Sequence, residues 1–378
     1  MKQSILIIAG EASGDNAGGL LCEEIKKLQP DLELFGLGGD RMTQAGVNLL
    51  YHINRLAFLG FWEVVRHIPF IRSVERDLLL ATDNRKPALA ILIDYPGFNL
   101  RFARKLKARG IPIIYYVSPQ VWAWGRKRIG KIKSLVDKMI VVFEFEKELY
   151  SREGMEVEWH GHPLLDIAGP MMDRAEFFRK AGLPESRNFI GLFPGSRLQE
   201  VARILPVMRD TVMAIRSSGM DLIGIVGSVS GIEDSVYREI TGNNFPLMKN
   251  MTYDIMANAD LNLVASGTAT LECAILGKPL FVLYKTSPLT YVIAKILIKI
   301  SNIALVNVVA GKRIVPEFIQ SRCGADNIAA EISDYFSNEG YRVKMSADLE
   351  NVHSKLGEAG ASRKAAESVL KMMFDAKN

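Results

Sequence analysis

One carboxylate of this chain, that of Asp94, stands where a side chain could take part in acid–base chemistry. It directly follows an apolar run, residues 88–93, which is typical of a buried strand. Partial desolvation at the tip of such a strand raises the pKa of a carboxylic acid, so Asp94 could accept a proton from a hydroxyl nucleophile. The alternative is that Asp94 caps the next helix, although Asn99 is better placed for that role.

A segment that combines glycines with polar side chains follows the first apolar run, residues 5–9. Glycines after a strand let a ligand approach the backbone closely. Their spacing over residues 10–19 does not fit G-x-G-x-x-G, which weakens a dinucleotide site. An ordinary flexible turn is the alternative to ligand binding. The candidates for hydrogen bonds to sugar hydroxyls are Glu11, Ser13 and Asp15.

A stretch near the middle of the chain could bind a diphosphate. Residues 261–265 predict a buried strand, 266–268 a tight turn, and 269–276 a helix that opens from the turn. The N–H groups and the dipole at such a helix start favour phosphate, and Glu272 in its first turns could reach the hydroxyls of a ribose. An ordinary strand–helix unit with a small-residue turn is the alternative.

Arg197 offers a second phosphate contact. It follows the apolar run 189–193 through a glycine turn and precedes a helix-like segment. A guanidinium group binds phosphate oxygens in a bidentate manner. A structural salt bridge to Glu200 is the competing interpretation.

Aromatic and apolar segments suggest contacts to a lipid or a sugar. Trp122 and Trp124 lie in a loop beside Arg126, Lys127 and Arg128, so they could bind a sugar face and a phosphate, or merely pack against the protein next to a solvated basic face. The segments 56–65 and 289–300 are broadly apolar. Core packing is the default for both, and an acyl-chain groove or an anionic membrane surface is the alternative.

The elements that must position these residues alternate between strand and helix. The strand-like runs are residues 5–9, 32–37, 88–93, 113–117 and 138–142, then 189–193, 221–226, 261–265 and 280–283. This alternation predicts α/β architecture with parallel sheets, whose ligands bind at the carboxyl ends of the strands. The length of 378 residues favours two domains, and the pattern predicts two Rossmann-like domains facing across a cleft, at 1–168 and 169–345.

Composition and missing motifs exclude several classes. A net charge of +5 is too weak to imply nucleic acid, although it suits an anionic substrate or membrane surface. Three scattered cysteines suggest a reducing cytoplasm, and we expect neither a signal peptide nor a membrane span. The sequence contains no GK[ST] loop, no H-E-x-x-H and no D-x-D, so we expect no metal and no cofactor. The role of His162, near the connection between the domains, stays open.

Taken together, these motifs resemble the bacterial lipid-A-disaccharide synthases, glycosyltransferases of the GT-B architecture. The resemblance covers essentially the whole chain and rests on five stretches in the family order: residues 10–15, 93–99, 117–124, 193–197 and 266–272. It implies transfer of 2,3-diacylglucosamine from its UDP donor to 2,3-diacylglucosamine 1-phosphate (lipid X), without a metal and with inversion. It also implies a cytoplasmic enzyme attached peripherally to the inner membrane, with phospholipid at its surface.

The resemblance assigns roles to individual residues. Asp94 would be the general base, Glu11 and Ser13 would position a sugar or assist that base, and Glu272 would hold the ribose. Donor contacts would come from Arg197, Ser266, Gly267, Thr268, Ala269, Thr270 and Asn307. The acceptor and its lipid chains would contact Trp122, Trp124, Arg126, Phe58, Phe61 and Trp62.

The resemblance also implies a homodimer with exchanged C-terminal segments, in which Asn307 would act in the partner's site. The last helices, from about residue 346 to 378, would return to the first domain.

Three other classes compete with this interpretation. A UDP-N-acetylglucosamine 2-epimerase would share the architecture and the site at residues 266–272, but would have no use for the apolar segments. An NAD-dependent oxidoreductase would need the missing glycine fingerprint. A lipid-binding scaffold without catalysis would explain the apolar segments and leave Asp94 and Arg197 without a role.

Overall fold

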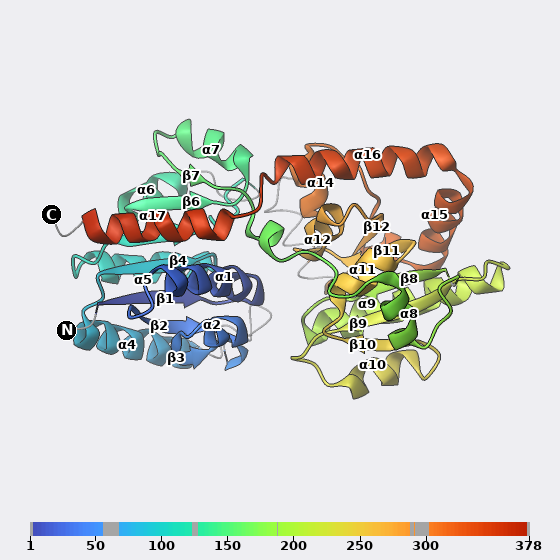
Figure 1. Ribbon diagram of the computed structural model, residues 1–378, viewed down its shortest axis with the longest axis horizontal. Coiled ribbons are helices and arrows are strands. Elements are labelled where there is room, and N and C mark those ends of the chain that lie inside the picture. Colours follow the sequence, from blue (N-terminus) through green and yellow to red (C-terminus); the bar gives the residue numbers. More distant parts are fainter. Residues whose placement is uncertain are drawn as a thin grey trace. The chain divides into compact units, whose positions relative to one another are not determined.

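The computed structural model describes residues 3–55, 68–122, 128–186, 188–287, 291 and 302–375. The chain forms two compact units: unit 1 comprises 1–166 and 356–378, and unit 2 comprises 167–355. Both chain ends therefore belong to unit 1 (Figure 1). The return that we expected at about residue 346 falls inside helix α16 (Glu339–Lys355). This helix packs on α12 (Ala269–Ile275) and α14 (Leu305–Ala310) of unit 2, and the chain leaves that unit only after Lys355.

Unit 1 is built on a seven-stranded sheet in the order β3-β2-β1-β4-β5-β6-β7, and all of its strand pairs are parallel. The central strands β1, β4 and β5 are buried and, apart from Ser4, apolar, as expected of strands whose two faces are both covered by helices. The strands are β1 (Ser4–Ala9), β2 (Glu33–Gly38), β3 (Asn48–His52), β4 (Leu89–Ile93), β5 (Ile113–Tyr116), β6 (Lys138–Val141) and β7 (Glu158–Trp159).

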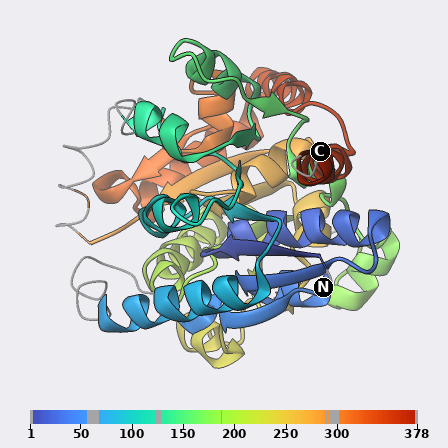
Figure 2. The same cartoon turned by 90° about the vertical axis from the view of Figure 1, so that its left-hand side faces the viewer.

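Helices cover both faces of this sheet. On one face, alternate residues of the strands, such as Leu6 and Ile8, join the apolar sides of α4, α5 and α6 in a single core. Helix α1 packs against β1, β2 and α17 (Figures 1 and 2). The helices of unit 1 are α1 (Ala12–Leu28), α2 (Asp40–Gln44), α4 (Ile68–Arg85), α5 (Pro96–Lys107), α6 (Ile129–Leu135), α7 (Glu144–Ser151) and α17 (Ala361–Asp375).

Unit 2 contains a six-stranded sheet in the order β10-β9-β8-β11-β12-β13, again with parallel pairs throughout. Its strands are β8 (Phe189–Phe193), β9 (Ile223–Ser228), β10 (Leu247–Lys249), β11 (Leu261–Ala265), β12 (Leu280–Tyr284) and β13 (Glu317–Ile319). Its helices are α8 (Arg174–Ala181), α9 (Leu198–Ser217), α10 (Asp234–Thr241), α11 (Thr252–Asn258), α12 (Ala269–Ile275), α14 (Leu305–Ala310), α15 (Ala325–Ser337) and α16.

The prediction of two Rossmann-like α/β domains is confirmed. The apolar runs did not reveal strands β3, β7, β10 and β13. These strands have two to five residues each and are the outermost strands of the two sheets. Strands in such positions bury less surface, so their sequences carry a weaker apolar signal. Among the described residues, no helix is long and apolar enough to cross a bilayer.

Candidate active site

The first candidate site lies at the carboxyl edge of the unit 1 sheet, between β1 and β4. These strands pair directly, with Ala9 opposite Ile93, and the strand order reverses at this point. Such a reversal leaves a crevice beyond the strand ends, where α/β proteins bind their ligands. Because Glu11 and Asp94 follow the two strands, both carboxylates come to this edge.

The backbone around Asp94 is held in a left-handed conformation. The φ angles of Asp94 and Tyr95 are 43° and 45°, which is costly for residues other than glycine. Three hydrogen bonds fix the turn: Asp94 N–H donates to the Tyr116 carbonyl at 3.2 Å, the Asn99 amide donates to the Asp94 carbonyl at 2.8 Å, and the Tyr115 hydroxyl donates to the same carbonyl. The turn is therefore over-determined by its neighbours, as expected where a side chain must be held in place.

Neither Asp94 nor Asn99 caps helix α5. The N-cap of α5 is Tyr95, and no side chain caps the helix. Asn99 lies in the first turn of α5 and donates backwards, to the carbonyls of Ile93 and Asp94. The capping alternative is therefore wrong for Asp94, and the expectation that Asn99 caps is wrong too: its amide stabilises the end of β4.

Burial raises the pKa of the Asp94 carboxyl to about 7, and the negative charge of Glu11 adds to this effect. The Tyr95 backbone N–H acts in the opposite direction by hydrogen bonding to the carboxylate. A carboxylate with a pKa near neutrality is a much stronger base than an exposed one, and it is still ionised in half or more of the molecules above pH 7.

The segment after β1 is helical rather than an open glycine loop. Helix α1 begins at Ala12, with Glu11 as its N-cap, so Ser13 lies exposed in the first turn and Glu11 is partly buried. A Cβ atom at Gly10 would lie 2.1 Å from the Tyr95 ring, so glycine is required for the close approach of this turn to Asp94 and Tyr95.

The expectation that Asp15 binds a sugar is wrong. Its side chain is buried and accepts hydrogen bonds from the N–H groups of Gly39, Arg41 and Met42 at 2.6, 3.1 and 3.1 Å. The carboxylate thereby satisfies the start of α2 and ties it to α1. Both carboxylate oxygens are therefore used by the backbone that follows β2.

Only part of the expected acceptor surface lies within the described residues. Trp122 is partly buried and contacts the Phe145 ring edge-on at a centroid distance of 5.9 Å, so it does pack against the protein. Its indole N–H is buried and has no hydrogen-bond partner among the residues that the structure describes. The remaining predicted contacts lie outside the described residues: Trp124, Arg126, Phe58, Phe61 and Trp62.

The second candidate site lies at the carboxyl edge of the unit 2 sheet, between β8 and β11. These strands pair with Val264 opposite Phe193, and the strand order again reverses at this point. The turns that leave the two strands, 194–197 and 266–268, therefore start side by side. The structure brings the two predicted phosphate-binding turns together at one edge.

Arg197 is exposed and forms the predicted salt bridge, with 3.2 Å between its Nη1 atom and Oε1 of Glu200. The other oxygen of Glu200 accepts the N–H groups of Ser196 and Arg197 at 3.1 and 3.3 Å. Gly195 has a φ angle of 115°, and a Cβ there would lie 2.4 Å from that oxygen. The competing salt bridge is therefore present. An exposed pair of this kind contributes little to stability, so it leaves the guanidinium able to turn towards an anion.

The small-residue turn after β11 has two different parts. Ser266 donates its hydroxyl to the Ile303 carbonyl at 3.2 Å, and Thr270 donates its buried hydroxyl to the Gly267 carbonyl at 2.8 Å. Both side chains therefore brace the turn. Helix α12 begins at Ala269, with Thr268 as its N-cap, and the first N–H groups of a helix have no partner within it. Gly267, Thr268 and Ala269 present their backbone at this point.

Glu272 lies in the first turn of α12 and is partly buried. Burial raises the pKa of its carboxyl, and a hydrogen bond from the Tyr253 hydroxyl, 3.2 Å long, opposes this change. Tyr253 comes from the neighbouring helix α11 and was not revealed by the sequence. The tyrosine fixes the orientation of the carboxylate at the sheet edge.

The expectation that the Asn307 side chain contacts a nucleotide is not supported by its geometry. The side chain is fully buried in unit 2, and its amide group donates to the Val315 carbonyl and to Glu317, at 3.0 and 2.8 Å. Its oxygen accepts the N–H groups of Ile314 and Val315 at 2.8 and 3.0 Å. All hydrogen-bonding capacity of the amide is thus used to join α14 to β13.

His162, whose role the sequence left open, has a structural environment. Its ring lies 5.2 Å from that of Phe143, and Nδ1 accepts the Leu164 N–H at 3.2 Å. The backbone N–H of His162 donates to the Leu356 carbonyl at 2.8 Å, where the chain returns to unit 1. Burial lowers the pKa of the imidazole to about 4, so it is neutral at physiological pH.

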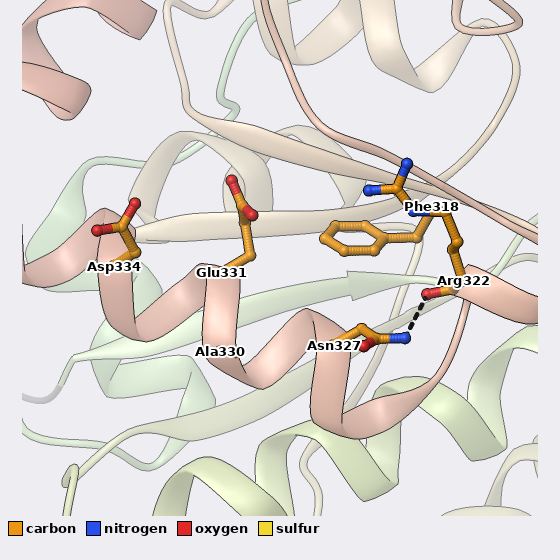
Figure 3. Close-up of a pocket in the computed structure, with 6 residues that line it drawn as sticks. All are labelled: Phe318, Arg322, Asn327, Ala330, Glu331 and Asp334. Carbon is orange, nitrogen blue, oxygen red and sulfur yellow. Dashed lines mark hydrogen bonds between the residues drawn. The ribbon is translucent and has the colours of Figure 1, made fainter.

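A surface hollow of about 390 Å³ lies elsewhere on unit 2 (Figure 3). It is lined by β13, the segment after it and α15, through Phe318, Arg322, Asn327, Ala330, Glu331 and Asp334. None of the predicted site residues lines it. Among the described residues, no group of three or more His, Cys, Asp or Glu side chains is arranged to hold a metal ion.

Comparison with protein families gives a match over almost the entire chain. A model of the family described as lipid-A-disaccharide synthetase matches residues 5–372. The lipid-A-disaccharide synthase of Geobacter sulfurreducens is 42% identical over 372 residues, which cover 98% of this chain and 97% of that protein. That of Syntrophus aciditrophicus is 40% identical over 373 residues, with 98% and 97% covered.

Solved structures show the same fold at low sequence identity. A UDP-GlcNAc 2-epimerase from Neisseria meningitidis bound to UDP-GlcNAc aligns with a TM-score of 0.64 and 15% identity, covering 98% of this chain and 100% of that one. The spinosyn rhamnosyltransferase SpnG aligns with a TM-score of 0.61 and 9% identity, covering 97% and 100%. Glycosyltransferases and epimerases thus share this architecture, and the fold alone does not separate them.

Proposed function

The chain belongs to the lipid-A-disaccharide synthase family, and we propose that it transfers 2,3-diacylglucosamine from UDP-2,3-diacylglucosamine to 2,3-diacylglucosamine 1-phosphate (lipid X). The products are UDP and a β-1,6-linked disaccharide 1-phosphate, an intermediate of lipid A. The observation that carries this proposal is the pairing of a family match over residues 5–372 with a carboxylate whose pKa is about 7 at the sheet edge of unit 1.

In this mechanism Asp94 is the general base. Its carboxylate accepts the proton of the acceptor 6-hydroxyl while that oxygen attacks the anomeric carbon of the donor, opposite the bond to UDP. Attack from that side inverts the configuration at the anomeric carbon. The raised pKa supports this role, because a base near the working pH takes up the proton most effectively. Glu11 and Ser13, at the start of α1, position a sugar beside it.

Unit 2 stabilises the leaving diphosphate. Arg197 supplies a positive charge, and the backbone at Gly267, Thr268 and Ala269 supplies N–H groups at the start of α12. Glu272 accepts hydrogen bonds from the ribose hydroxyls, with its orientation set by Tyr253. The proposed reaction needs no metal, since Arg197 and these N–H groups carry out the charge stabilisation.

Three further properties are proposed from the family resemblance. The enzyme acts at the cytoplasmic face of the inner membrane and is held there peripherally, with phospholipid at its surface. It forms a homodimer with exchanged C-terminal segments. Its two domains correspond to the acceptor, in unit 1, and the UDP-sugar donor, in unit 2. Static light scattering and co-sedimentation with anionic phospholipid vesicles would test the dimer and the membrane attachment.

The decisive experiment is release of UDP by the purified protein in detergent micelles. We expect release from UDP-2,3-diacylglucosamine only when lipid X is also present, and the disaccharide should appear in equal amount. Turnover of UDP-N-acetylglucosamine alone, with no release that depends on lipid X, would instead identify an epimerase. Asp40→Asn, an exposed carboxylate of unit 1 at α2, is the control for a loss of charge outside the site.

A further inference from the structure

A buried carboxylate outside the described sites lies next to the Asp94 turn. Glu146 is in the first turn of α7 and is only 1% exposed. One of its oxygens accepts the Phe143 N–H at 3.3 Å, and the other accepts the hydroxyl of Ser118, from the loop after β5. A glutamate at this helix position commonly closes a capping box at the protein surface. Full burial, with one oxygen used for a different loop, exceeds what a cap requires.

The loop that Glu146 holds adjoins Asp94. Ile93 of β4 pairs with Tyr116 of β5, so Val117 lies opposite Asp94 across the sheet edge. The N–H of Asp94 donates to the Tyr116 carbonyl at 3.2 Å, while Val117 N–H donates to Ile140 of the next strand at 3.1 Å. Ser118 therefore begins a loop that leaves β5 two residues after Tyr116, the residue that is hydrogen-bonded to the backbone of the proposed base.

Val117 is strained. Its φ angle is 60°, and a β-branched residue rarely adopts a left-handed conformation. Together with Asp94 and Tyr95 it forms a patch of left-handed, non-glycine backbone at a single sheet edge. Strain of this kind persists only where surrounding contacts enforce it. The bond from Ser118 to Glu146 is the side-chain contact that holds the residue next to Val117.

The same carboxylate faces Trp122, the described member of the predicted acceptor surface. The Trp122 indole N–H lowers the pKa of Glu146 as a neighbouring donor, yet it is not in hydrogen-bonding geometry with any atom of the described residues. The hydroxyl of Tyr150 lies near Ser118, which lowers its pKa, but it too makes no hydrogen bond of good geometry within the described part of the chain. Burial raises the pKa of Glu146 to about 7, which the surrounding donors oppose.

We propose that Glu146 is a positioning residue of the transfer reaction: by holding Ser118 it fixes the loop 117–122 beside Asp94 and places Trp122 to meet the acceptor. This inference rests on the proposed function. Glu146 does not touch substrate. It acts through Ser118 and the strained Val117, which link it to the turn of the base.

The test compares Glu146→Gln with two other variants of the full chain. Glutamine keeps the size of the side chain but replaces one of the two accepting oxygens by an amide nitrogen, which cannot accept a hydrogen bond. Ser118→Ala removes the loop's side of the same bond and serves if Glu146→Gln does not fold. Glu144→Gln is the matched control, because it makes the same substitution at an exposed residue in the same turn of α7.

Two measurements are made on each variant: kcat and KM for donor and for lipid X, and amide hydrogen exchange of peptides covering 117–122. We expect Glu146→Gln and Ser118→Ala to raise exchange in this loop and to raise the KM for lipid X about tenfold, with the donor KM within twofold of the wild type. Glu144→Gln should change neither quantity. A lower Tm with unchanged kcat and KM would reduce Glu146 to a structural cap and overturn the proposal.

The exchange measurement separates this proposal from the proposed function. If loop exchange is unchanged in both variants, Glu146 does not hold the loop, and the inference fails whatever the activity. If exchange rises but the wild type releases no UDP with lipid X, the proposed function fails, and the positioning of a transfer reaction fails with it. Equal increases in the KM for both substrates would also overturn the inference, because the effect would then not be specific to the acceptor.

Discussion

The sheet edges of units 1 and 2 use the same topology for different chemistry. In each, two parallel strands pair where the strand order reverses, Ala9 with Ile93 in one and Phe193 with Val264 in the other. Unit 1 places two carboxylates at this edge. Unit 2 places a glycine turn, an exposed arginine and the start of a helix there. Since the scaffolds match, we attribute the proposed roles of the two edges, proton transfer in unit 1 and diphosphate binding in unit 2, to the residues of the turns.

The two edges also differ in how their turns are held. After β4 and β5 of unit 1 the left-handed residues are Asp94, Tyr95 and Val117, none of them glycine, and buried tyrosine and asparagine side chains hold the end of β4. In the turn after β8 of unit 2 the left-handed residue is Gly195, which adopts its φ angle without strain. Among the described residues of unit 2, the left-handed positions that are not glycine, Asn250 and Gln320, follow the outer strands β10 and β13. A strained turn fixes one group in one place, as a base requires. A relaxed turn with backbone N–H groups can adjust to a ligand.

Replacement of the proposed base should give the largest effect. We expect Asp94→Asn to lower kcat by about 10²- to 10⁴-fold, because general-base catalysis contributes that range. The donor KM should stay within about twofold, since the donor site lies in unit 2. Steady-state kinetics with both lipids measure this. Near-normal turnover of the folded variant would mean that the proton goes to another group, and the contrast between the two edges would be lost.

Removal of the arginine should affect the other edge. We expect Arg197→Ala to lower kcat/KM for the donor by about 10²-fold, the lower end of what loss of one transition-state contact costs. The KM for lipid X should not change. Arg203→Ala, an exposed arginine of the same helix α9, is the control and should be nearly neutral. If Arg197→Ala and Arg203→Ala behave alike, Arg197 serves only its salt bridge to Glu200.

The same substitution at Asp94 should stabilise the protein at alkaline pH. The pKa of Asp94 is about 7 in the folded protein against an ordinary value of 3.8, so the folded state holds a proton more tightly than the unfolded state. The free energy of unfolding therefore falls as pH rises from about 4 through 7. Asn cannot ionise, so Asp94→Asn should be more stable than the wild type by about 2 kcal/mol at pH 8. This figure is smaller than the full value for a pKa shift from 3.8 to about 7, because the carboxylate is partly exposed and solvent screens its charge.

Chemical denaturation of Asp94→Asn and the wild type at pH 5 and pH 8 checks this. The difference in free energy of unfolding should be small at pH 5 and large at pH 8. A difference that is the same at both values would show that Asp94 does not carry a raised pKa. A lower stability of the variant at pH 8 would contradict the argument directly. Such a gain in stability with loss of activity is the usual trade-off at a catalytic site.

The strands that carry these residues could be predicted from sequence, because buried parallel strands are continuous apolar runs and polar residues mark their ends. Asp94, Arg197 and Glu272 stood out for that reason. The internal roles of Asp15 and Asn307 could not be predicted. Both residues are of types that also bind ligands. Asp15, however, bonds to backbone groups 24 or more residues away, and Asn307 bonds to the backbone of a buried turn. Local sequence does not show which polar side chain finds a ligand and which finds the protein's own backbone.

The ribose contact should give a smaller effect at the edge of unit 2. We expect Glu272→Gln to raise the KM for the donor and the inhibition constant of UDP by about tenfold, as loss of a charged hydrogen bond costs. kcat should change little, because the ribose is far from the reacting bond. Tyr253→Phe removes the 3.2 Å bond that orients the carboxylate and should have a weaker effect in the same direction. An unchanged inhibition constant for UDP in Glu272→Gln would exclude the ribose contact.

The smallest effect should come from the second carboxylate of unit 1. The profile of kcat/KM against pH should rise on its acidic side to a plateau above about 7, because Asp94 must be ionised to accept a proton and its pKa is about 7. The charge of Glu11 is one cause of that pKa, smaller than burial. Glu11→Gln should therefore move the acidic limb to lower pH, while Ser13→Ala, next but one in the chain, should leave it in place.

A limb that does not move, with kcat lowered instead, would show that Glu11 acts on the sugar rather than on the base. A limb that moves to higher pH would contradict the sign of the charge effect, since removing a negative neighbour makes the carboxylate easier to ionise.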